Sequence, residues 1–471
     1  MPLIQPVALE PISDLGPVHF IAAGGAGMSG VAALYAESGV VTSGSDQAAS
    51  AALDGLAQAG VRTFVGHDPA QLGDAQTVVV SSAVRPTNVE LAEARRRGLR
   101  VWHRSAALGA LMLGRRGVAV TGTHGKTTTS AMIATLLTAV GADPSYVVGS
   151  PLTATGRSQR RGQGEAFVVE ADESDGSFLQ YPAEIVVITN VESDHLDNWG
   201  TPQRYAQGFV DLATADAVRT VVLSADDPGA VAITPAVRAA GKQVVTFGEA
   251  ASADIRLGQI EVAGRRSSAA LYSADDHGQI CLAVPGRYNL MNAAAAYAVG
   301  RILGVPGEAL RAAASDFAGT YRRFQPISDR GGVRIFDDYA HHPTEVRATL
   351  TAARSLVEGG RLVACFQPHL FSRTRDFAAE FGAALSLADR VVVLGIYPAR
   401  EDPIPGVTGQ LVADAAAELG APGTVSYAET LAAGVQRLAD LVRPGDVVIT
   451  IGAGDVTKVG PLLAESLAGR G

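Results

Sequence analysis

The chain has 471 residues, of which 47% are hydrophobic and 18% charged, and its formal net charge is −9. This balance supplies ample apolar material for cores, and three domains is the natural expectation for the length. The negative charge argues against a general nucleic-acid-binding surface. The N-terminal segment MPLIQPVALEPISDLG lacks a basic stretch followed by a long apolar run, and we expect neither a secretory signal nor membrane insertion.

The chain is poor in cysteine and lysine. Its only cysteines, Cys281 and Cys365, lie far apart and suggest neither a disulfide framework nor a thiolate metal site, which fits a reducing cytoplasm. Of the 38 basic residues only Lys126, Lys242 and Lys458 are lysines, a bias that genome composition explains. One of these lysines nevertheless stands in a candidate phosphate loop, where a compact ammonium is better suited than a planar guanidinium.

The first glycine-rich segment, VHFIAAGGAGMSGVAALYAESG, spans Val18–Gly39 and predicts a strand, a tight turn and a helix. Gly25, Gly27 and Gly30 fit the pattern G-x-G-x-x-G, and Asp46 follows the next predicted strand, as in dinucleotide-binding domains. Such glycines let a backbone approach any nucleotide diphosphate, and they also permit close packing of a helix on a strand. NAD or NADP, another nucleotide and a purely structural role all stay open on this segment alone.

The second glycine-rich segment, VAVTGTHGKTTTSAM, spans Val118–Met132 and is similar to a phosphate-binding loop. The usual pattern is G-x-x-x-x-G-K-[ST]; here Val120 stands at the first glycine position and the pattern is shortened to Gly122–Thr127. Successive backbone N–H groups can form an anion nest, Lys126 can reach the outer phosphates, and the Thr127 hydroxyl can ligate Mg²⁺. The strand before and the helix after supply the context that such a loop requires.

Two apolar strands downstream of this loop end in acidic residues. They are FVVEADESDGSF and IVVITNVESDHLDNW, with Glu170, Asp172, Glu173 and Asp175 in the first and Glu192, Asp194 and His195 in the second. Hard cations prefer oxygen ligands, so carboxylates at strand ends beside a phosphate loop favour a Mg²⁺ site, although acidic runs are commonly solvated loops. The histidine is weaker evidence, since imidazole is an uncommon Mg²⁺ ligand.

The remaining elements indicate three α/β domains. A third strand-and-helix region begins near VRIFDDYAHHPTEVRATLTAARSL and continues through RLVACFQPH, DRVVVLGIY and DVVITIGAGD. The stretch from about Ala250 to Pro285 has short alternating runs and reads as antiparallel strands inserted in the second domain. We place boundaries near Gly114 and Phe324, which gives domains 1–114, 115–323 and 324–471. The predicted architecture is a Rossmann-like first domain, a central P-loop-type ATPase domain and a Rossmann-like C-terminal domain.

A series of short motifs in a fixed order resembles the Mur ligase family of bacterial peptidoglycan synthesis over nearly the whole chain. Each motif alone is weak, and their order makes the resemblance specific. The motifs are GGAGMSG (24–30), GSD (44–46), SSAV (81–84), GTHGKTTT (122–129), EADESD (170–175), TNVESDHLD (189–197), NLMNA (289–293), RRF (322–324), DDYAHHPTE (337–345), FQPH (366–369), SRT (372–374) and GAGD (452–455).

The resemblance implies a first domain that holds a UDP-sugar, a second that is the ATPase, and a third that brings adenine contacts and the incoming amino acid. The implied reaction joins L-alanine to the lactyl carboxylate of UDP-N-acetylmuramate. ATP phosphorylates that carboxylate, the alanine amine attacks the acyl phosphate, and phosphate leaves. The family uses ATP and Mg²⁺, here expected as two ions, and no redox cofactor. The implied location is the bacterial cytoplasm, and no oligomeric state is indicated.

The resemblance also assigns roles to individual residues. The UDP-sugar set is Gly24, Gly25, Gly27, Met28, Ser29, Asp46 and Ser82. The ATP set is Gly122, Thr123, His124, Gly125, Lys126, Thr127, Thr128, Asn292, Arg323, Asp338 and Tyr339. The metal ligands would be Thr127, Glu173 and His195, with Glu170 as the alternative to Glu173, and the catalytic set is Lys126, Glu173, His195, His369 and Arg373.

Some features depart from the family pattern or favour other classes. Tyr288 stands where relatives often have a histidine, which puts any role of that imidazole in doubt. No lysine lies between Lys126 and Lys242, so the carbamylated lysine of the later-adding ligases cannot form, which favours the alanine-adding branch; a murein-tripeptide recycling ligase is the nearest alternative.

Two other classes of protein each explain only part of the sequence. A dehydrogenase would leave the phosphate loop unexplained, and a nucleotide switch would leave FQPH unexplained. Arg322 and Arg323 could be a plain surface pair, and a transition-metal site at His341–His342 lacks the spacing of zinc ligands.

Overall fold

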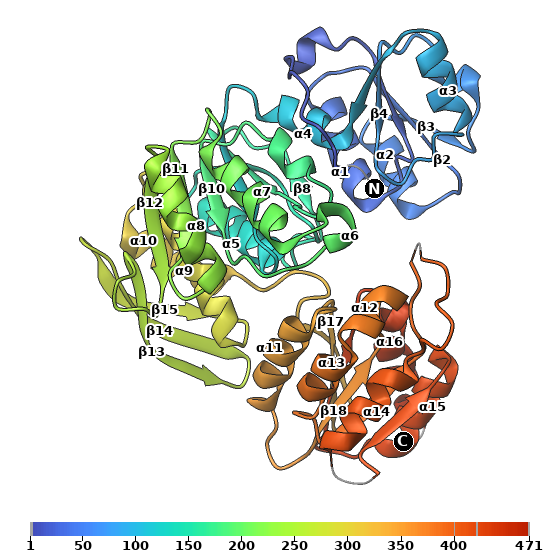
Figure 1. Cartoon of the computed structure of the whole chain (residues 1–471), viewed down its shortest axis with the longest axis vertical. Coiled ribbons are helices and arrows are strands. Elements are labelled where there is room, and N and C mark those ends of the chain that lie inside the picture. The colour runs from blue at the N-terminus through green and yellow to red at the C-terminus, as the bar shows by residue number, and fades with distance from the viewer. Residues whose placement is uncertain (1–2, 400, 421–422, 470–471) are drawn as a thin grey trace. The chain divides into compact units, whose positions relative to one another are not determined.

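The computed structural model describes residues 3–399, 401–420 and 423–469, whose strands form three sheets (Figure 1). The first sheet has the order β3-β2-β1-β4-β5 and is parallel throughout. Its central strand VHFI is buried along its length, as expected where helices cover both faces. The strands are β1 (Val18–Ile21), β2 (Thr42–Asp46), β3 (Arg62–Val65), β4 (Thr77–Val80) and β5 (Arg100–His103), and the helices are α1 (Ala26–Glu37), α2 (Ala51–Gln58), α3 (Val89–Arg96) and α4 (Arg104–Met112).

The second sheet has the order β15-β14-β13-β12-β11-β10-β6-β9-β7-β8. Strand β6 lies between β9 and β10, in register at Val118↔Val168 and Val118↔Ile185, so the three carboxyl ends meet at one edge. The strands are β6 (Arg116–Thr121), β7 (Ser145–Val147), β8 (Gln159–Arg160), β9 (Ala166–Glu170), β10 (Ile185–Ile188), β11 (Thr220–Ser224), β12 (Gln243–Gly248), β13 (Ile255–Ala263), β14 (Arg266–Tyr272) and β15 (His277–Leu282). The helices are α5 (Lys126–Ala139), α6 (Leu196–Trp199), α7 (Pro202–Thr214), α8 (Pro228–Ala239), α9 (Arg287–Ile302) and α10 (Gly307–Ala313).

The edge strands β13–β15 match the inserted strands expected from the sequence. Only residues 264–265 separate β13 from β14, and a connection that short joins antiparallel neighbours. Their burial alternates along the strand, as in a sheet with one solvated face.

The third sheet has the order β16-β17-β21-β18-β19-β20 and is parallel apart from β16. Buried strands such as VVITI in β21 pack against helices on both faces. The strands are β16 (Gln325–Arg330), β17 (Val333–Asp338), β18 (Leu362–Phe366), β19 (Arg390–Leu394), β20 (Val425–Ala428) and β21 (Val447–Ile451), and the helices are α11 (Pro343–Arg354), α12 (Phe371–Asp376), α13 (Ala378–Leu385), α14 (Gln410–Leu419), α15 (Leu431–Leu441) and α16 (Val459–Ala468). The α/β expectation is confirmed.

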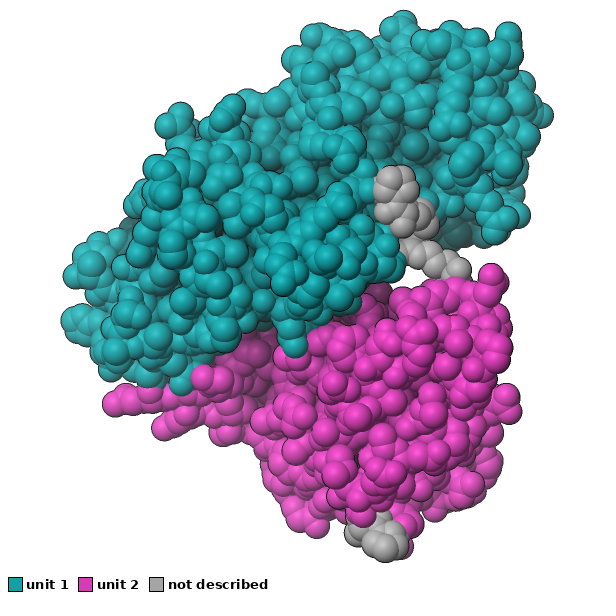
Figure 2. Space-filling view, viewed as in Figure 1, with its two compact units in different colours: residues 1–258, 270–278, 291–316 teal, residues 259–269, 279–290, 317–471 magenta. Residues whose placement is uncertain are grey.

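The chain divides into two compact units (Figure 2). Unit 1 comprises residues 1–258, 270–278 and 291–316, and unit 2 comprises residues 259–269, 279–290 and 317–471. The first two sheets lie mainly in unit 1, and the third lies in unit 2. The boundaries near Gly114 and Phe324 stay a prediction. Among the described residues, no helix combines the length and apolar character needed to cross a membrane.

Candidate active site

The phosphate-loop candidate of unit 1 lies between β6 and α5. Gly122 has φ +127° and Gly125 has φ +84°, values that residues with a side chain rarely adopt. A Cβ added at Gly122 would lie 2.1 Å from Thr189 Oγ1, and one at Gly125 would lie 2.9 Å from Asn292 Oδ1. Both glycines are therefore required by backbone geometry and by close packing. The contact with Asn292 also brings one predicted ATP residue from α9 against the loop.

Asn190, which follows β10, holds the loop in this shape. Its Oδ1 accepts from the backbone N–H of His124 at 2.8 Å, and its Nδ2 donates to the carbonyl of the same residue at 3.0 Å. The Thr123 N–H donates to the Asn190 carbonyl at 3.2 Å. The sequence placed Asn190 in a family motif without giving it a role. Its position could have indicated this role, because Asn190 comes just after an apolar strand that we expected in the same sheet as the strand before the phosphate loop.

Lys126 is the first residue of α5 and turns back over the loop. Its Nζ donates to the carbonyls of Gly122 and Thr123 at 2.8 and 3.1 Å, and it lies 2.9 Å from Glu173 Oε2. Burial opposes the ammonium charge, but the carboxylates of Glu173, Asp172 and Glu170 outweigh burial and raise the pKa of Lys126. The site therefore holds a fixed positive charge over a ring of backbone groups, which suits a polyphosphate.

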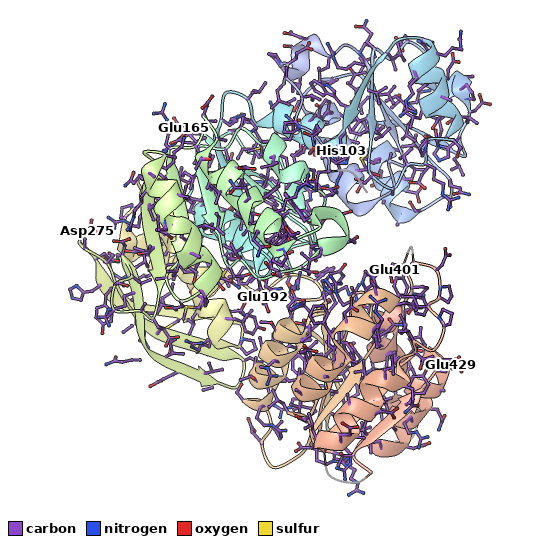
Figure 3. The ribbon with its side chains drawn as sticks, in the orientation of Figure 1. His103, Glu165, Glu192, Asp275, Glu401 and Glu429 are labelled. Atoms are coloured by element: carbon purple, nitrogen blue, oxygen red, sulfur yellow. The ribbon has the colours of Figure 1, made fainter. Side chains whose placement is uncertain are left out.

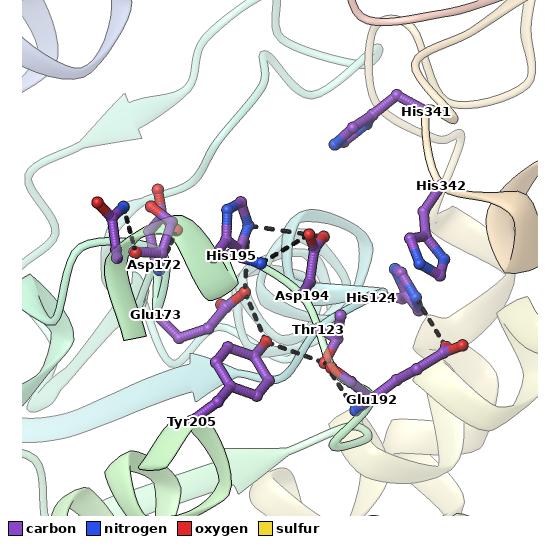
Figure 4. A network of polar contacts seen from close by, with 12 residues as sticks. Thr123, His124, Asp172, Glu173, Glu192, Asp194, His195, Tyr205, His341 and His342 are labelled. Atoms are coloured by element: carbon purple, nitrogen blue, oxygen red, sulfur yellow. Dashed lines mark hydrogen bonds and ion pairs between the residues drawn. The ribbon is translucent and has the colours of Figure 1, made fainter. Parts of the chain in front are cut away.

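Glu173 lies at the centre of a buried polar network (Figure 4). The Tyr205 hydroxyl donates to its Oε1 at 3.2 Å and lies 3.0 Å from Thr123 Oγ1, which connects the carboxylate to the loop. Burial raises the pKa of Glu173, with Lys126 opposing. Burial by itself would also raise the pKa of Asp172, but the charge of Lys126 and the hydrogen bond from the Ser174 N–H lower it below its usual value overall. Tyr205 was missed by the sequence analysis, because α7 carries no motif that marks it.

Glu170, at the end of β9, accepts a hydrogen bond from the predicted metal-binding threonine. The Thr127 hydroxyl donates to Glu170 Oε1 at 3.1 Å, and the Gly149 N–H donates to Oε2 at 2.7 Å. Thus Thr127 lies against Glu170, whereas Glu173 lies against Lys126. The Thr127 hydroxyl and the Glu170 carboxylate, with Asp172 and Glu173 in the same acidic run, supply the oxygen ligands that Mg²⁺ prefers.

His195 stands just before α6 in the left-handed conformation, with φ +53°. Its Nε2 lies 3.7 Å from Asp194 Oδ2 and 3.9 Å from Glu173 Oε1 (Figure 4). The structure therefore brings His195 to the same carboxylate that contacts Lys126.

The glycine-rich turn of the first sheet lies where β1 meets α1. The Gly24 N–H donates to Asp46 Oδ2 at 2.8 Å, so this carboxylate at the end of β2 holds the turn. A Cβ added at Gly27 would lie 1.9 Å from Arg104 Nη1, so a side chain at residue 27 would displace that guanidinium. Arg104 was missed by the sequence analysis; its only signal was its place where β5 passes into α4. A guanidinium over a glycine turn at a helix N-terminus suits a diphosphate.

The other first-domain predictions lie in α1 and just after β4. Met28 is buried in α1, and Ser29 follows it in the same helix. Ser82 donates from Oγ to Asp175 Oδ2 at 2.9 Å and lies 3.2 Å from His103 Nε2 (Figure 3 labels His103). Ser82 therefore connects the first sheet with the acidic run that follows β9.

Unit 2 carries the remaining predicted residues, of which Asp338, Tyr339 and His369 lie at or just after the carboxyl ends of strands. Asp338 ends β17 and accepts from the N–H groups of Phe324 and Ala340, each at 2.8 Å. Arg323 lies over the ring of Tyr339, 5.2 Å from the centroid.

The partly buried side chain of Arg322 makes polar contacts within unit 2. It lies 3.3 Å from Asp337 Oδ2 and donates to the carbonyls of Gly452 and Gly454, so it is not a plain surface residue. His342 is the N-cap of α11, where its Nδ1 accepts from Thr344. Tyr288 packs against the core of unit 2, and burial raises the pKa of its hydroxyl, so it cannot replace a titrating imidazole near neutral pH.

Stability should fall with rising pH because of Asp338. Burial raises the pKa of this carboxyl from 3.8 to about 6. Between these values the folded protein binds more protons than the unfolded chain, so the free energy of unfolding decreases as pH rises, by about 3 kcal/mol in total. Urea unfolding from pH 4 to 7 measures this slope. In Asp338→Asn the free energy of unfolding should lack this decrease of about 3 kcal/mol between pH 4 and 7. The same pH dependence in the variant and the wild type would show that the carboxyl titrates normally.

Known protein families match three successive parts of the chain. Three family models match the chain: "Mur ligase family, catalytic domain" over residues 17–116, "Mur ligase middle domain" over 120–300, and "Mur ligase, glutamate ligase domain" over 322–454. The UDP-N-acetylmuramate–L-alanine ligase of Cutibacterium acnes is 61% identical over 472 residues, covering 100% of both chains. The chain belongs to the Mur ligase family.

Further relatives support the same membership along the whole chain of this Mur ligase. The UDP-N-acetylmuramate–L-alanine ligase of Kineococcus radiotolerans is 52% identical over 98% of each chain. The solved UDP-N-acetylmuramate–alanine ligase of Thermotoga maritima has a TM-score of 0.79 at 28% identity, covering 97% of this chain and 100% of that one. A murein peptide ligase from Psychrobacter arcticus, with a TM-score of 0.69 at 23% identity over 96% of this chain and 98% of that one, shares the fold.

Proposed function

We propose that this Mur ligase joins L-alanine to the lactyl carboxylate of UDP-N-acetylmuramate, with ATP cleaved to ADP and phosphate. The observation that carries the proposal is the 61% identity, over the full length, to a relative named for that reaction. The lysine-free stretch between Lys126 and Lys242 agrees with it, because the later-adding relatives use a lysine there. A cytoplasmic location belongs to the proposal, since ATP is the energy source.

The chemical need explains the phosphate loop. A carboxylate is a poor acylating agent because it has no good leaving group. In the proposed reaction a lactyl oxygen forms a bond to the γ-phosphorus of ATP, and the bond to ADP breaks. The alanine nitrogen then attacks the acyl carbon, loses a proton, and phosphate leaves. The chain contributes positioning and charge neutralisation: Lys126 and the loop N–H groups hold the outer phosphates where charge develops.

The two substrates of the first step would bind at separate glycine turns of unit 1. The turn at Gly24–Gly27, with Asp46 and Arg104, would hold the diphosphate of the UDP-sugar. The loop at Gly122–Gly125 would hold ATP. Asp175, in the acidic run after β9, accepts from Ser82, which follows β4, so this hydrogen bond connects the first sheet with the second.

Magnesium would bind among the oxygens beside Thr127, with Glu170, Glu173 and His195 as the proposed ligands. When bound, Mg²⁺ would neutralise charge on the phosphates and on the acyl oxygen. Because Thr127 contacts Glu170 in this structure, we place Glu170 beside Thr127 in the first ion's site. Glu173, which contacts Lys126 and approaches His195, would serve the second.

Glu170→Gln should therefore raise the Mg²⁺ concentration needed for half-maximal activity at least tenfold. The amide keeps the hydrogen bond from Thr127 but loses the charge that holds the cation; tenfold corresponds to about 1.4 kcal/mol. Glu165→Gln, an exposed change on the loop before β9, is the matched control. Titration of activity with Mg²⁺ at saturating ATP measures the effect. Equal Mg²⁺ requirements in both variants would remove Glu170 from the ion site.

Lys126→Arg should not restore activity, although the chain uses arginine nearly everywhere else. The lysine fits between two loop carbonyls and Glu173, and a guanidinium is bulkier and planar. We expect turnover below about a tenth of wild type, equivalent to at least about 1.4 kcal/mol. Steady-state phosphate release measures it. Turnover above that limit would mean that any cation suffices at this position.

A substrate-omission assay tests the proposed function itself. Phosphate release and product mass are followed with ATP, Mg²⁺, UDP-N-acetylmuramate and L-alanine, and again with each omitted, beside an NADH and NADPH absorbance trace. We expect stoichiometric ADP, phosphate and the alanine amide, with no absorbance change. Preference for an L-alanine-containing tripeptide over L-alanine would indicate a recycling ligase instead, and a coenzyme absorbance change would indicate a dehydrogenase.

A further inference from the structure

A short segment of unit 2, which we call the strap, runs along the residues that carry His369 and Arg373. The strap comprises residues 395–399 and Glu401, after β19. Two backbone hydrogen bonds join it to the FQPH segment: Tyr397 N–H donates to the Pro368 carbonyl at 2.8 Å, and Leu370 N–H donates to the Tyr397 carbonyl at 3.0 Å. They lie on either side of His369, so the strap fixes the backbone there.

The strap also fixes the plane of the His369 imidazole. The Tyr397 ring stacks on it, with centroids 6.0 Å apart and planes 16° apart. Gly454 also packs against the tyrosine: a Cβ added there would lie 2.5 Å from Tyr397 Cγ, so only glycine leaves room for the ring. The GAGD turn after β21 therefore supports the tyrosine, and the tyrosine supports the histidine.

Glu401 holds the start of α12, the helix that carries Arg373. The Ser372 N–H donates to Glu401 Oε2 at 3.0 Å, and the Ser372 hydroxyl donates to Oε1. Burial raises the pKa of Glu401, but the hydrogen bonds from Ser372 and the nearby His369 lower it overall, so the carboxylate is charged. With both oxygens engaged by Ser372, Glu401 acts through the helix.

The backbone between these two contacts is strained. Leu370 has φ +69° and ψ 140°, a conformation that costs a residue with a side chain energy and persists only when its surroundings impose it. The Leu370 carbonyl accepts from Thr374 Oγ1 at 2.7 Å, which ties the strained residue to α12. His369 and Arg373 thus lie on either side of a distorted residue that the strap holds in place.

We propose that Glu401 is a positioning residue: it holds α12 so that Arg373 meets the carboxylate of the incoming amino acid. This inference rests on the proposed function for the identity of that amino acid. Arg373 is buried and supplies a fork of donors suited to a carboxylate. A small shift of the helix start would misplace that fork without touching the ATP loop of unit 1.

The test compares Glu401→Ala with Glu401→Gln and with Glu429→Ala, an exposed glutamate of the same unit (both glutamates are labelled in Figure 3). We expect Glu401→Ala to raise the KM for L-alanine at least tenfold. The KM for ATP and for UDP-N-acetylmuramate should stay within twofold of wild type. Glu401→Gln, which keeps one acceptor for Ser372, should recover part of the loss, and Glu429→Ala should match wild type. Equal KM values for alanine in all variants would overturn the inference.

Hydrogen exchange separates failure of this inference from failure of the proposed function. In Glu401→Ala the amides of residues 367–376 should exchange at least tenfold faster than in Glu429→Ala, with the rest of unit 2 unchanged. Unchanged exchange would overturn the positioning role whatever the enzyme's substrate, and so would unfolding of the whole unit. A third outcome is possible: the wild-type enzyme does not use L-alanine, but exchange in Glu401→Ala is still faster only at residues 367–376. That outcome would overturn the identity of the amino acid and leave the positioning role of Glu401 intact.

Discussion

Lys126→Ala is expected to lower the ligation rate at least several hundredfold while leaving affinity for UDP-N-acetylmuramate within twofold of wild type. Lys126 is the charge fixed over the ATP loop, held by two carbonyls and Glu173. Loss of a contact to phosphate charge in the transition state costs about 3–4 kcal/mol. The glycine turn at Gly24–Gly27 belongs to another sheet of unit 1, so its ligand should still bind. Single-turnover rates and calorimetry measure the two quantities.

Lys242→Ala is the matched control for this change. Lys242 also donates to two carbonyls, those of Ala215 and Val218 at 2.7 and 2.8 Å, but it lies away from the phosphate loop. We expect it to lower stability and leave the rate constant near wild type. If UDP-N-acetylmuramate affinity collapsed together with activity in Lys126→Ala, the assignment of two separate nucleotide sites would be wrong.

Gly122→Ala should lower kcat/KM for ATP at least a hundredfold. The new methyl group would lie 2.1 Å from Thr189 Oγ1 and 3.0 Å from Asn190 N, so the loop must move away from the residues that shape it. The positive φ adds about 1 kcal/mol of strain. A displaced loop no longer presents its N–H groups together, and even small misplacement is costly when catalysis depends on positioning.

Gly141→Ala separates the two effects. Gly141 lies just beyond the end of α5 with φ +79°, and a Cβ there would meet nothing within 4 Å. It should show the strain as a loss of about 1 kcal/mol in stability, with kinetics unchanged. Equal loss of kcat/KM in both variants would mean that backbone strain, and not the shape of the phosphate loop, is responsible.

Local patterns in the sequence predicted much of this site. The glycines at 122 and 125 and the lysine that follows them are close in sequence, and their chemistry requires that spacing. Apolar strands that end in acidic residues placed Glu170 and Glu173 beside the loop, because parallel strands bring their carboxyl ends to one edge. The inserted strands β13–β15 were visible from their alternation.

Contacts between distant parts of the chain were not predictable in the same way. Arg104 reaches Gly27 from another strand end, and Tyr205 reaches Glu173 from a helix whose sequence is ordinary. Glu401, in the connection after β19, contacts Ser372, in the connection before β19. In each case the partner is set by how helices pack on a sheet, and neither spacing nor composition records it. The hydrogen bond from Thr127 to Glu170, and not to Glu173, was likewise not predictable from the sequence.

The central claim is that ATP phosphorylates the lactyl carboxylate before the amide forms. The most direct measurement is to run the reaction with UDP-N-acetylmuramate carrying ¹⁸O in both lactyl carboxylate oxygens and to determine the ¹⁸O content of each product by mass spectrometry. The account predicts that each phosphate released carries one ¹⁸O and that the amide carbonyl keeps the other, because the acyl oxygen leaves with the phosphoryl group. Phosphate without label, or label recovered in AMP, would contradict an acyl phosphate intermediate.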